Sequence, residues 1–237
     1  MIWCISYSNA ITWSFISLIE NKGFVDAYVD TFHKMYEDAY IKKEVEGVSK
    51  IMDMLMRDLD ATASIVIDIR FNGGGQDAVS FEILSRFISE SKLQIATQKL
   101  KYKDHFSPVL PLYIKGSTNA YSKPLYVLTS PQTGSAAEAF AIATMAMNNV
   151  KRIGAPTAGA MSTALEKTLP IGWAFSISNE IYMDNQGTNY ENIGIPVDYN
   201  LDYSRDRQTF FRNVANDLDN DKTQILEAIE SLNNNNH

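Results

Sequence analysis

The chain has 237 residues, a formal net charge of −7, 45% apolar residues and 11% aromatic residues. This length and composition suit one sizeable packed core and exclude a chain that is disordered throughout. The acidic balance argues against a nucleic-acid or anionic-membrane binder, which would need a basic surface. Cys4 is the only cysteine and there are three histidines. Those counts exclude an internal disulfide framework and leave little material for a metal site.

The first nineteen residues carry no charge. They contain frequent serines and no basic start, which argues against a signal peptide or a membrane anchor. Residues 11–19 are rich in β-branched and aromatic side chains, which predicts a strand close to the start of the chain. We expect a start this abrupt to mean that something upstream is absent. Helical spacing of apolar residues follows twice, over residues 24–36 and 45–59.

Two short β-branched runs predict buried parallel strands, and each is followed by a turn and a helix. The first run, residues 64–69, leads through the turn RFNGGGQD into a helix whose apolar face covers residues 79–88. The second run, residues 124–129, leads through SPQTG into an alanine-rich helix over residues 135–147. Alternation of strands and helices predicts the α/β class.

Weaker patterns cover the rest of the chain, which we interpret as one domain over residues 1–232. The expected elements are a strand over 93–102, an irregular loop over 104–122, a short strand over 150–153, a loop over 154–163, a hairpin or two consecutive strands over 173–177 and 180–183, a last helix over 223–232, and a disordered tail over 233–237.

The three consecutive glycines, residues 73–75, follow a predicted buried strand. Glycine tolerates the dihedral angles that turn neighbouring N–H groups toward one cavity, so this turn could hold an anion. It lacks the lysine and the spacing of a phosphate-binding loop. An oxyanion hole or a simple tight turn both remain compatible with it.

Ser135 lies at the start of the alanine-rich helix. It could act only as a helix N-cap, with Glu138 completing a capping box. A serine at a strand–turn–helix junction is also where several hydrolase folds place a nucleophile. There the helix N-terminus and the Ala136 amide would stabilise a developing negative charge.

Taken together and in order, six segments resemble the C-terminal-processing (tail-specific) serine peptidase family, which includes the tricorn core protease and the interphotoreceptor retinoid-binding protein repeats. The segments are IVIDIRFNGGG at 65–75, TGSAAE at 133–138, IGAPTAG at 153–159, LPIGWAFSISNEIY at 169–182, YENIGIPVD at 190–198 and DKTQILEAIESL at 221–232.

The resemblance implies a crotonase-like (ClpP-like) α/β core of ββα units, without cofactor or nucleic-acid partner. In it Ser135 would be the nucleophile, and the amides of Ala136 and of Gly74 or Gly75 would form the oxyanion hole. A polypeptide substrate would lie extended and could add as a strand to a sheet edge. The resemblance also implies a cell-envelope, periplasmic or extracellular location.

The general base is harder to assign. One branch of the family uses a lysine in a pattern like G-x-x-T-x-G-K, and here that position is Ala160. The other branch uses a histidine from an N-terminal region and a glutamate, which falls on Glu191. His33, His105 and His237 do not match that histidine, although His105 is a weak alternative, and Lys167 is best interpreted as a solvated side chain.

Three functions therefore stay open. The first is a peptidase core that on its own has at most weak activity, because it lacks a convincing base. The second is a non-catalytic module that binds an extended peptide or an apolar ligand in the same cleft. The third is an acyl-CoA enzyme of the crotonase type, against which the absence of a nucleotide-binding signature argues.

Overall fold

The computed structural model describes most of the chain, in five stretches: residues 2–4, 41–102, 105–162, 164–178 and 180–234. The strand expected over 11–19 and the helix expected over 24–36 lie outside the described residues.

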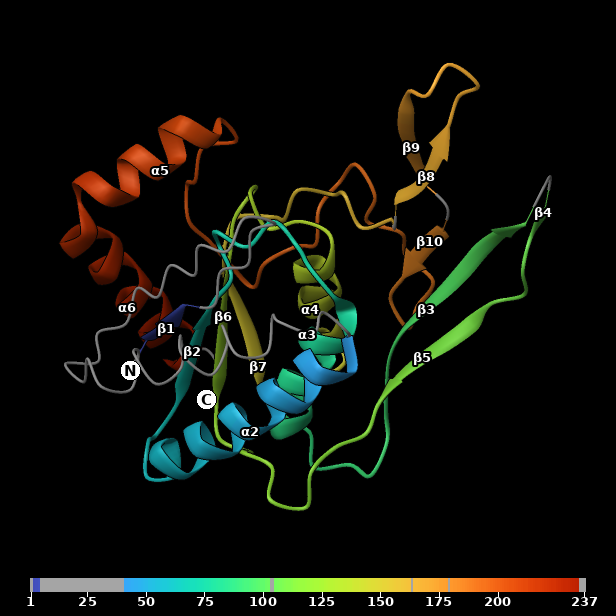
Figure 1. The fold of residues 1–237 in the computed structure, drawn as a ribbon. Coiled ribbons are helices and arrows are strands. Elements are labelled where there is room, and N and C mark those ends of the chain that lie inside the picture. Colours follow the sequence, from blue (N-terminus) through green and yellow to red (C-terminus); the bar gives the residue numbers. More distant parts are fainter. Residues whose placement is uncertain (1, 5–40, 103–104, 163, 179, 235–237) are drawn as a thin grey trace.

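A five-stranded sheet forms the centre of the molecule, with all neighbouring strands parallel. Its order is β1-β2-β6-β7-β11 (Figure 1). The strands are β1 (Ile2–Cys4), β2 (Ile65–Asp68), β6 (Leu125–Thr129), β7 (Val150–Gly154) and β11 (Tyr199–Asn200). Every residue of β2 and β6 is buried, as expected for strands covered on both faces.

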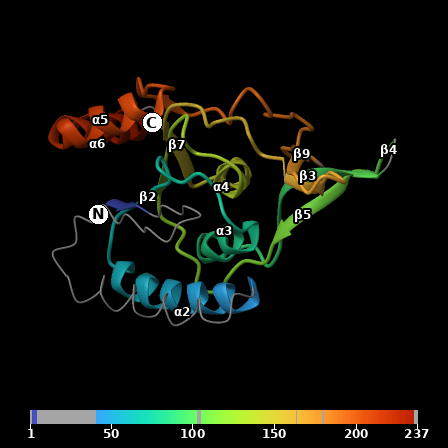
Figure 2. The same ribbon diagram turned by 45° about the horizontal axis from the view of Figure 1, so that its top comes forward.

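Helices cover both faces of this sheet, as Figure 2 shows. They are α2 (Ile41–Leu59), α3 (Asp77–Leu84), which continues into a 3-10 turn at Ser85–Phe87, α4 (Ala136–Thr144), α5 (Arg207–Asn216) and α6 (Leu218–Asn234). Ile65 and Ile67 of β2 join the larger core with α2, α3 and α4, whereas Val66 joins a smaller core with α6. Successive side chains of a strand point to opposite faces, so one strand serves both cores.

A second, antiparallel sheet projects from the side of the central core (Figures 1 and 2). It contains β3 (Leu93–Tyr102), which pairs with β4 (His105–Phe106), β5 (Leu110–Ile114) and β10 (Glu180–Met183). A separate hairpin pairs β8 (Ala164–Thr168) with β9 (Ala174–Ser178).

Several expectations are confirmed, among them the α/β class, the helix ending at Leu59 and the strands at 64–69, 93–102, 124–129 and 150–153. The interpretation of residues 104–122 as irregular is wrong, because β4 and β5 lie there. Pro111 pointed to a loop. Among the described residues, however, β3 is the one strand that pairs with β5, and an edge strand tolerates proline.

Of the two arrangements open for 173–183, two separate strands is the correct one, because β9 pairs with β8 and β10 pairs with β3. The sequence also did not indicate α5, and α6 extends beyond both ends predicted for the last helix, as far as Asn234. Within the described residues, no helix is both long and apolar enough to cross a membrane. The same residues contain no group of three His, Cys, Asp or Glu that could hold a metal ion.

Candidate active site

The carboxyl ends of β2, β6 and β7 lie side by side, at the edge where open α/β sheets bind ligands. Four loops meet at this edge: residues 69–76, 130–135, 155–162 and 184–198. Thr157 joins the last two, because its N–H donates to the Ile195 carbonyl and its hydroxyl accepts from the Ile195 N–H, at 3.3 and 2.7 Å. All the site residues expected from the sequence lie in these loops or at the first residue of α4.

Buried hydroxyl groups join the glycine turn to the serine turn. Thr133 Oγ1 donates to the Ile69 carbonyl at 2.9 Å, and Ser130 Oγ donates to the Arg70 carbonyl at 2.6 Å. Thr133 and Ser130 are both fully buried. Each such bond contributes about 1 kcal/mol, and leaving one partner unpaired would cost more. The two turns therefore form one rigid unit.

Ser135 occupies a strained turn directly before α4. Its backbone angles are φ 52° and ψ −126°, a conformation that costs on the order of 1–3 kcal/mol for a residue with a side chain. Its N–H donates to the Ala160 carbonyl at 3.0 Å and to Glu138 Oε2 at 3.2 Å, which holds the turn in place. The Ser135 side chain is exposed at the helix N-terminus. This is the geometry of a nucleophile on a strand-to-helix turn.

Gly74 lies directly against this serine. Its φ is +125°, and a Cβ added to it would lie 2.5 Å from Ser135 Cβ and 3.0 Å from Ser135 Oγ. The serine hydroxyl therefore faces the glycine turn. Only glycine fits at position 74, both because of the close approach and because of the backbone conformation.

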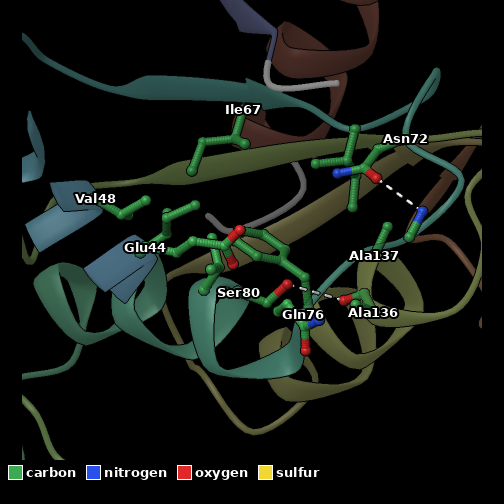
Figure 3. Close-up of a pocket in the computed structure, with 14 residues that line it drawn as sticks. Glu44, Val48, Ile67, Asn72, Gln76, Ser80, Ala136 and Ala137 are labelled. Carbon is green, nitrogen blue, oxygen red and sulfur yellow. Dashed lines mark hydrogen bonds between the residues drawn. The ribbon is translucent and has the colours of Figure 1, made fainter. Parts of the chain in front are cut away.

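The amides around Ser135 differ in whether they are already bonded. The Gly74 N–H donates to Asn72 Oδ1 at 2.9 Å (Figure 3). Among the residues that the structure describes, the N–H groups of Gly75 and Ala136 have no hydrogen-bond partner. Of the two glycines that the resemblance left open, the geometry therefore favours Gly75 as an oxyanion donor. With Ala136, it would supply the pair of donors that an oxyanion hole needs.

Glu138 does more than complete a capping box. Its carboxylate is fully buried and accepts hydrogen bonds from Thr157 Oγ1 at 2.6 Å, Gly159 N at 2.7 Å and Ala160 N at 2.8 Å, besides Ser135 N. Burial raises the pKa of Glu138, and the four donors oppose that rise. The side chain fastens the loop after β7 to the serine turn.

Glu191 holds the next part of the same loop. Its Oε2 accepts from Met161 N at 2.9 Å and Ser162 N at 3.2 Å. No hydrogen bond joins Glu191 to Ser135 in the described part of the chain. The link is indirect, since Ala160, beside Met161, accepts from the Ser135 N–H. The sequence predicted that the Glu191 carboxylate would support the site. In the structure, the 155–162 loop lies between this carboxylate and Ser135.

No lysine or histidine among the described residues forms a hydrogen bond with the Ser135 hydroxyl. Lys167 lies on the exposed hairpin strand β8, and His105 lies on β4, far from α4 in both ribbon views (Figures 1 and 2). Ala160, at the position of the family's lysine, offers no basic side chain. The remaining histidines lie outside the described residues: His33 and His237.

Arg70 was not singled out from the sequence. It is buried at the end of β2, where it pairs with Asp68 at 2.6 Å and with Asp221 of α6 at 2.8 Å. Arg70 also donates to the Tyr203 hydroxyl at 2.8 Å. The cluster anchors the strand that leads into the glycine turn, and its partners lie far apart in sequence, which is why no local motif revealed it.

These features define an α/β protein with a serine-hydrolase type of site: a strained, exposed serine at a helix N-terminus beside two amides that bond to no other described residue. Comparison with known proteins agrees. The sequence profile of peptidase family S41 matches residues 29–201, well over half of the chain. The chain belongs to peptidase family S41.

Solved structures show the same fold. A candidate peptidase from Parabacteroides merdae ATCC 43184 is 23% identical, with a TM-score of 0.60 over 71% of this chain and 56% of its own. The photosystem II D1 C-terminal processing protease is 20% identical, with a TM-score of 0.54 over 71% of this chain and 42% of its own.

A lipoprotein from Streptococcus agalactiae is 20% identical, with a TM-score of 0.51 over 66% of this chain and 57% of its own. The fold is the crotonase-like (ClpP-like) α/β core expected from the sequence. The chain spans about half the length of these matched structures.

Proposed function

We propose that this chain is the catalytic core of a serine endopeptidase, with Ser135 as the nucleophile and the amides of Gly75 and Ala136 as the oxyanion hole. The observation that carries the proposal is the exposed Ser135, held in a strained turn at the start of α4 beside two amides that bond to no other described residue. A serine with a purely structural role would not need this strain.

In the proposed reaction, Ser135 Oγ attacks the carbonyl carbon of the scissile peptide bond, and its proton passes to a base. The carbonyl oxygen becomes negatively charged and accepts from the Gly75 and Ala136 N–H groups. Each donor contributes about 3 kcal/mol to stabilising that charge. The amine then leaves with a proton, and water releases the acyl group from Ser135. The N-terminus of α4 adds a favourable field at the oxyanion.

In this proposal, two carboxylates position the nucleophile without touching substrate. Glu138 accepts hydrogen bonds from the N–H groups of Ser135, Gly159 and Ala160. Glu191 accepts from the next two amides of the same loop. Because the Ala160 carbonyl holds the Ser135 N–H, any shift of the loop would move the serine.

Membership of the S41 family implies a polypeptide substrate. We assign unfolded or C-terminal polypeptide segments, supported by the matched protease that processes the C-terminus of the D1 protein. A cell-envelope location is part of the same proposal, supported by the matched lipoprotein.

The proposal is tested by fluorophosphonate labelling and intact-mass measurement of the full chain. Labelling at pH 9 lets hydroxide replace a side-chain base in removing the serine proton. We expect one adduct, lost in Ser135→Ala and kept in Ser176→Ala, which removes an exposed hydroxyl from β9. An adduct that survives Ser135→Ala, or none in the native chain, contradicts the proposal.

Peptide hydrolysis is expected to be weak for this chain alone, because no described base contacts Ser135. The assay is cleavage of an unfolded protein, compared with Ser135→Ala. Rapid hydrolysis that is lost in the variant would contradict the expectation of a missing base, while leaving Ser135 as the nucleophile.

A second candidate, a module that binds an extended peptide without cleaving it, is favoured by the β8–β9 hairpin. Ile171 and Trp173 at its tip are 73% and 72% exposed, and Phe175 and Ile177 continue the apolar face of β9. Both edges of the hairpin lack a partner strand among the described residues, so an extended chain could pair there. Peptide binding that weakens in Trp173→Ser, together with no Ser135 adduct, would favour this candidate.

A further inference from the structure

A cavity of about 50 Å³ opens beside the proposed oxyanion amides (Figure 3). Gly74, Gly75 and Ala136 are among the residues that line it. A substrate whose carbonyl oxygen accepted from Gly75 and Ala136 would therefore direct the adjoining side chain, that of the residue before the scissile bond, into this cavity. This step rests on the proposed function of Ser135.

The cavity is small and mostly apolar. Its walls come from α2, β2, α3 and α4, and the apolar side chains among them are Val48, Ile67, Ile69, Val79, Ile83 and Phe140. A site for one water needs about 10–15 Å³, so this space is only a few times larger than that. A space this small favours an unbranched stem with a compact end group over an aromatic ring or the planar guanidinium of arginine.

Glu44, in the first turn of α2, points into the cavity (Figure 3). Of the described residues that line the cavity, it alone is charged. Among the residues that the structure describes, the Glu44 carboxylate has no hydrogen-bond or ion-pair partner. Partial burial raises the pKa of Glu44, which reflects the cost of holding a charge beside apolar walls.

A ligand with a cation at the end of an apolar stem would suit both the apolar walls and the Glu44 carboxylate. The stem would replace water along the apolar walls, and the positive charge would offset the cost of the carboxylate. An uncharged side chain of the same length would gain only the burial of its apolar stem, without the ion pair to Glu44. Lysine carries a compact ammonium on four methylene groups, so it supplies both the apolar stem and the positive charge.

We propose that this cavity selects lysine as the residue before the cleaved bond, with Glu44 receiving its ammonium group. Glu44 acts as a specificity-determining residue and takes no part in bond breaking. The predicted discrimination is between lysine and norleucine, which has the same four-carbon stem without the charge.

The test uses two fluorescein-labelled hexapeptides that end in lysine or norleucine with a free carboxylate, as cleavage products would. Their affinities for the full chain carrying Ser135→Ala are measured by fluorescence anisotropy. We expect the lysine peptide to bind about fivefold more tightly, which is the upper range for an ion pair that stays partly exposed. Glu44→Gln should remove that preference, and Glu46→Gln, which changes an exposed carboxylate on the same helix, should keep it.

Equal affinity for the two peptides, no binding of either, or a preference that survives Glu44→Gln would each overturn the proposal. Binding does not require the nucleophile, so the result is separable from the proposed function. A labelled Ser135 without a lysine preference refutes the specificity alone. A Glu44-dependent preference without a Ser135 adduct refutes the catalytic role and keeps the cavity as a lysine site.

Discussion

Replacing Gly74 with alanine tests whether the glycine turn and Ser135 act together, the turn by supplying an oxyanion donor and Ser135 as the nucleophile. The added methyl carbon would lie 2.5 Å from Ser135 Cβ and 3.2 Å from the Gly134 carbonyl oxygen, so the turn must move. The φ of +125° adds a penalty on the order of 1–3 kcal/mol for any residue with a side chain. A displaced turn would withdraw the Gly75 donor, which is worth about 3 kcal/mol, or roughly a hundredfold in rate.

The assay is the rate of fluorophosphonate labelling of Ser135, with thermal unfolding measured in parallel. The matched control is Gly73→Ala, because a Cβ at Gly73 meets nothing within 4 Å. We expect labelling to fall about a hundredfold in Gly74→Ala and to stay unchanged in Gly73→Ala. Unfolding of Gly74→Ala should begin only a few degrees lower, at roughly 2–4 °C per kcal/mol. Native labelling in Gly74→Ala, or an equal loss in Gly73→Ala, would refute the reasoning.

Three other substitutions separate positioning from stability. Glu138→Gln should slow labelling of Ser135 at least tenfold and lower the unfolding temperature. The buried glutamine amide cannot accept from all four donors, and an unpaired buried donor costs about 1–3 kcal/mol. Unchanged labelling would contradict this role of Glu138. Glu191→Gln should slow labelling several-fold while thermal unfolding shifts little, since the amide side chain keeps one acceptor oxygen for the Met161 N–H. Arg70→Met should lower the unfolding temperature by roughly 10 °C, because Asp68 stays buried without its cation at a cost of about 3–5 kcal/mol. A control at an exposed position, Arg212→Met, should change it by less than about 2 °C.

Local sequence patterns predicted the parts of the fold that depend on short stretches. The β-branched runs that became β2 and β6 are recognisable because both faces of these strands are buried. Strand β5 was missed because Pro111 signals a loop unless the pairing of an edge strand is known. Strand β8 has two charged residues in its centre, Glu166 and Lys167, and belongs to an exposed hairpin, so it lacks the apolar run of a buried strand.

The residues of the candidate site also fall into those that local sequence could place and those that only the fold brings together. Ser135 and Ala136 could be placed at a helix start from neighbouring residues alone. The wider role of Glu138 could not, because Thr157 and Gly159 lie about twenty residues away and reach it only through the fold. The choice between Gly74 and Gly75 also required coordinates, since it depends on the hydrogen bond that the Gly74 N–H donates to the Asn72 side chain.

The site separates two requirements of a serine nucleophile. Its geometry is maintained by buried hydrogen bonds: Glu138 and the Ala160 carbonyl hold the Ser135 N–H, and Gly74 leaves room for the hydroxyl. Proton removal is a different requirement, and no described side chain contacts the hydroxyl to meet it. Labelling at high pH depends on the first requirement and peptide hydrolysis near neutral pH on both. A chain that is labelled well but hydrolyses slowly would therefore show a preorganised nucleophile that lacks only its base.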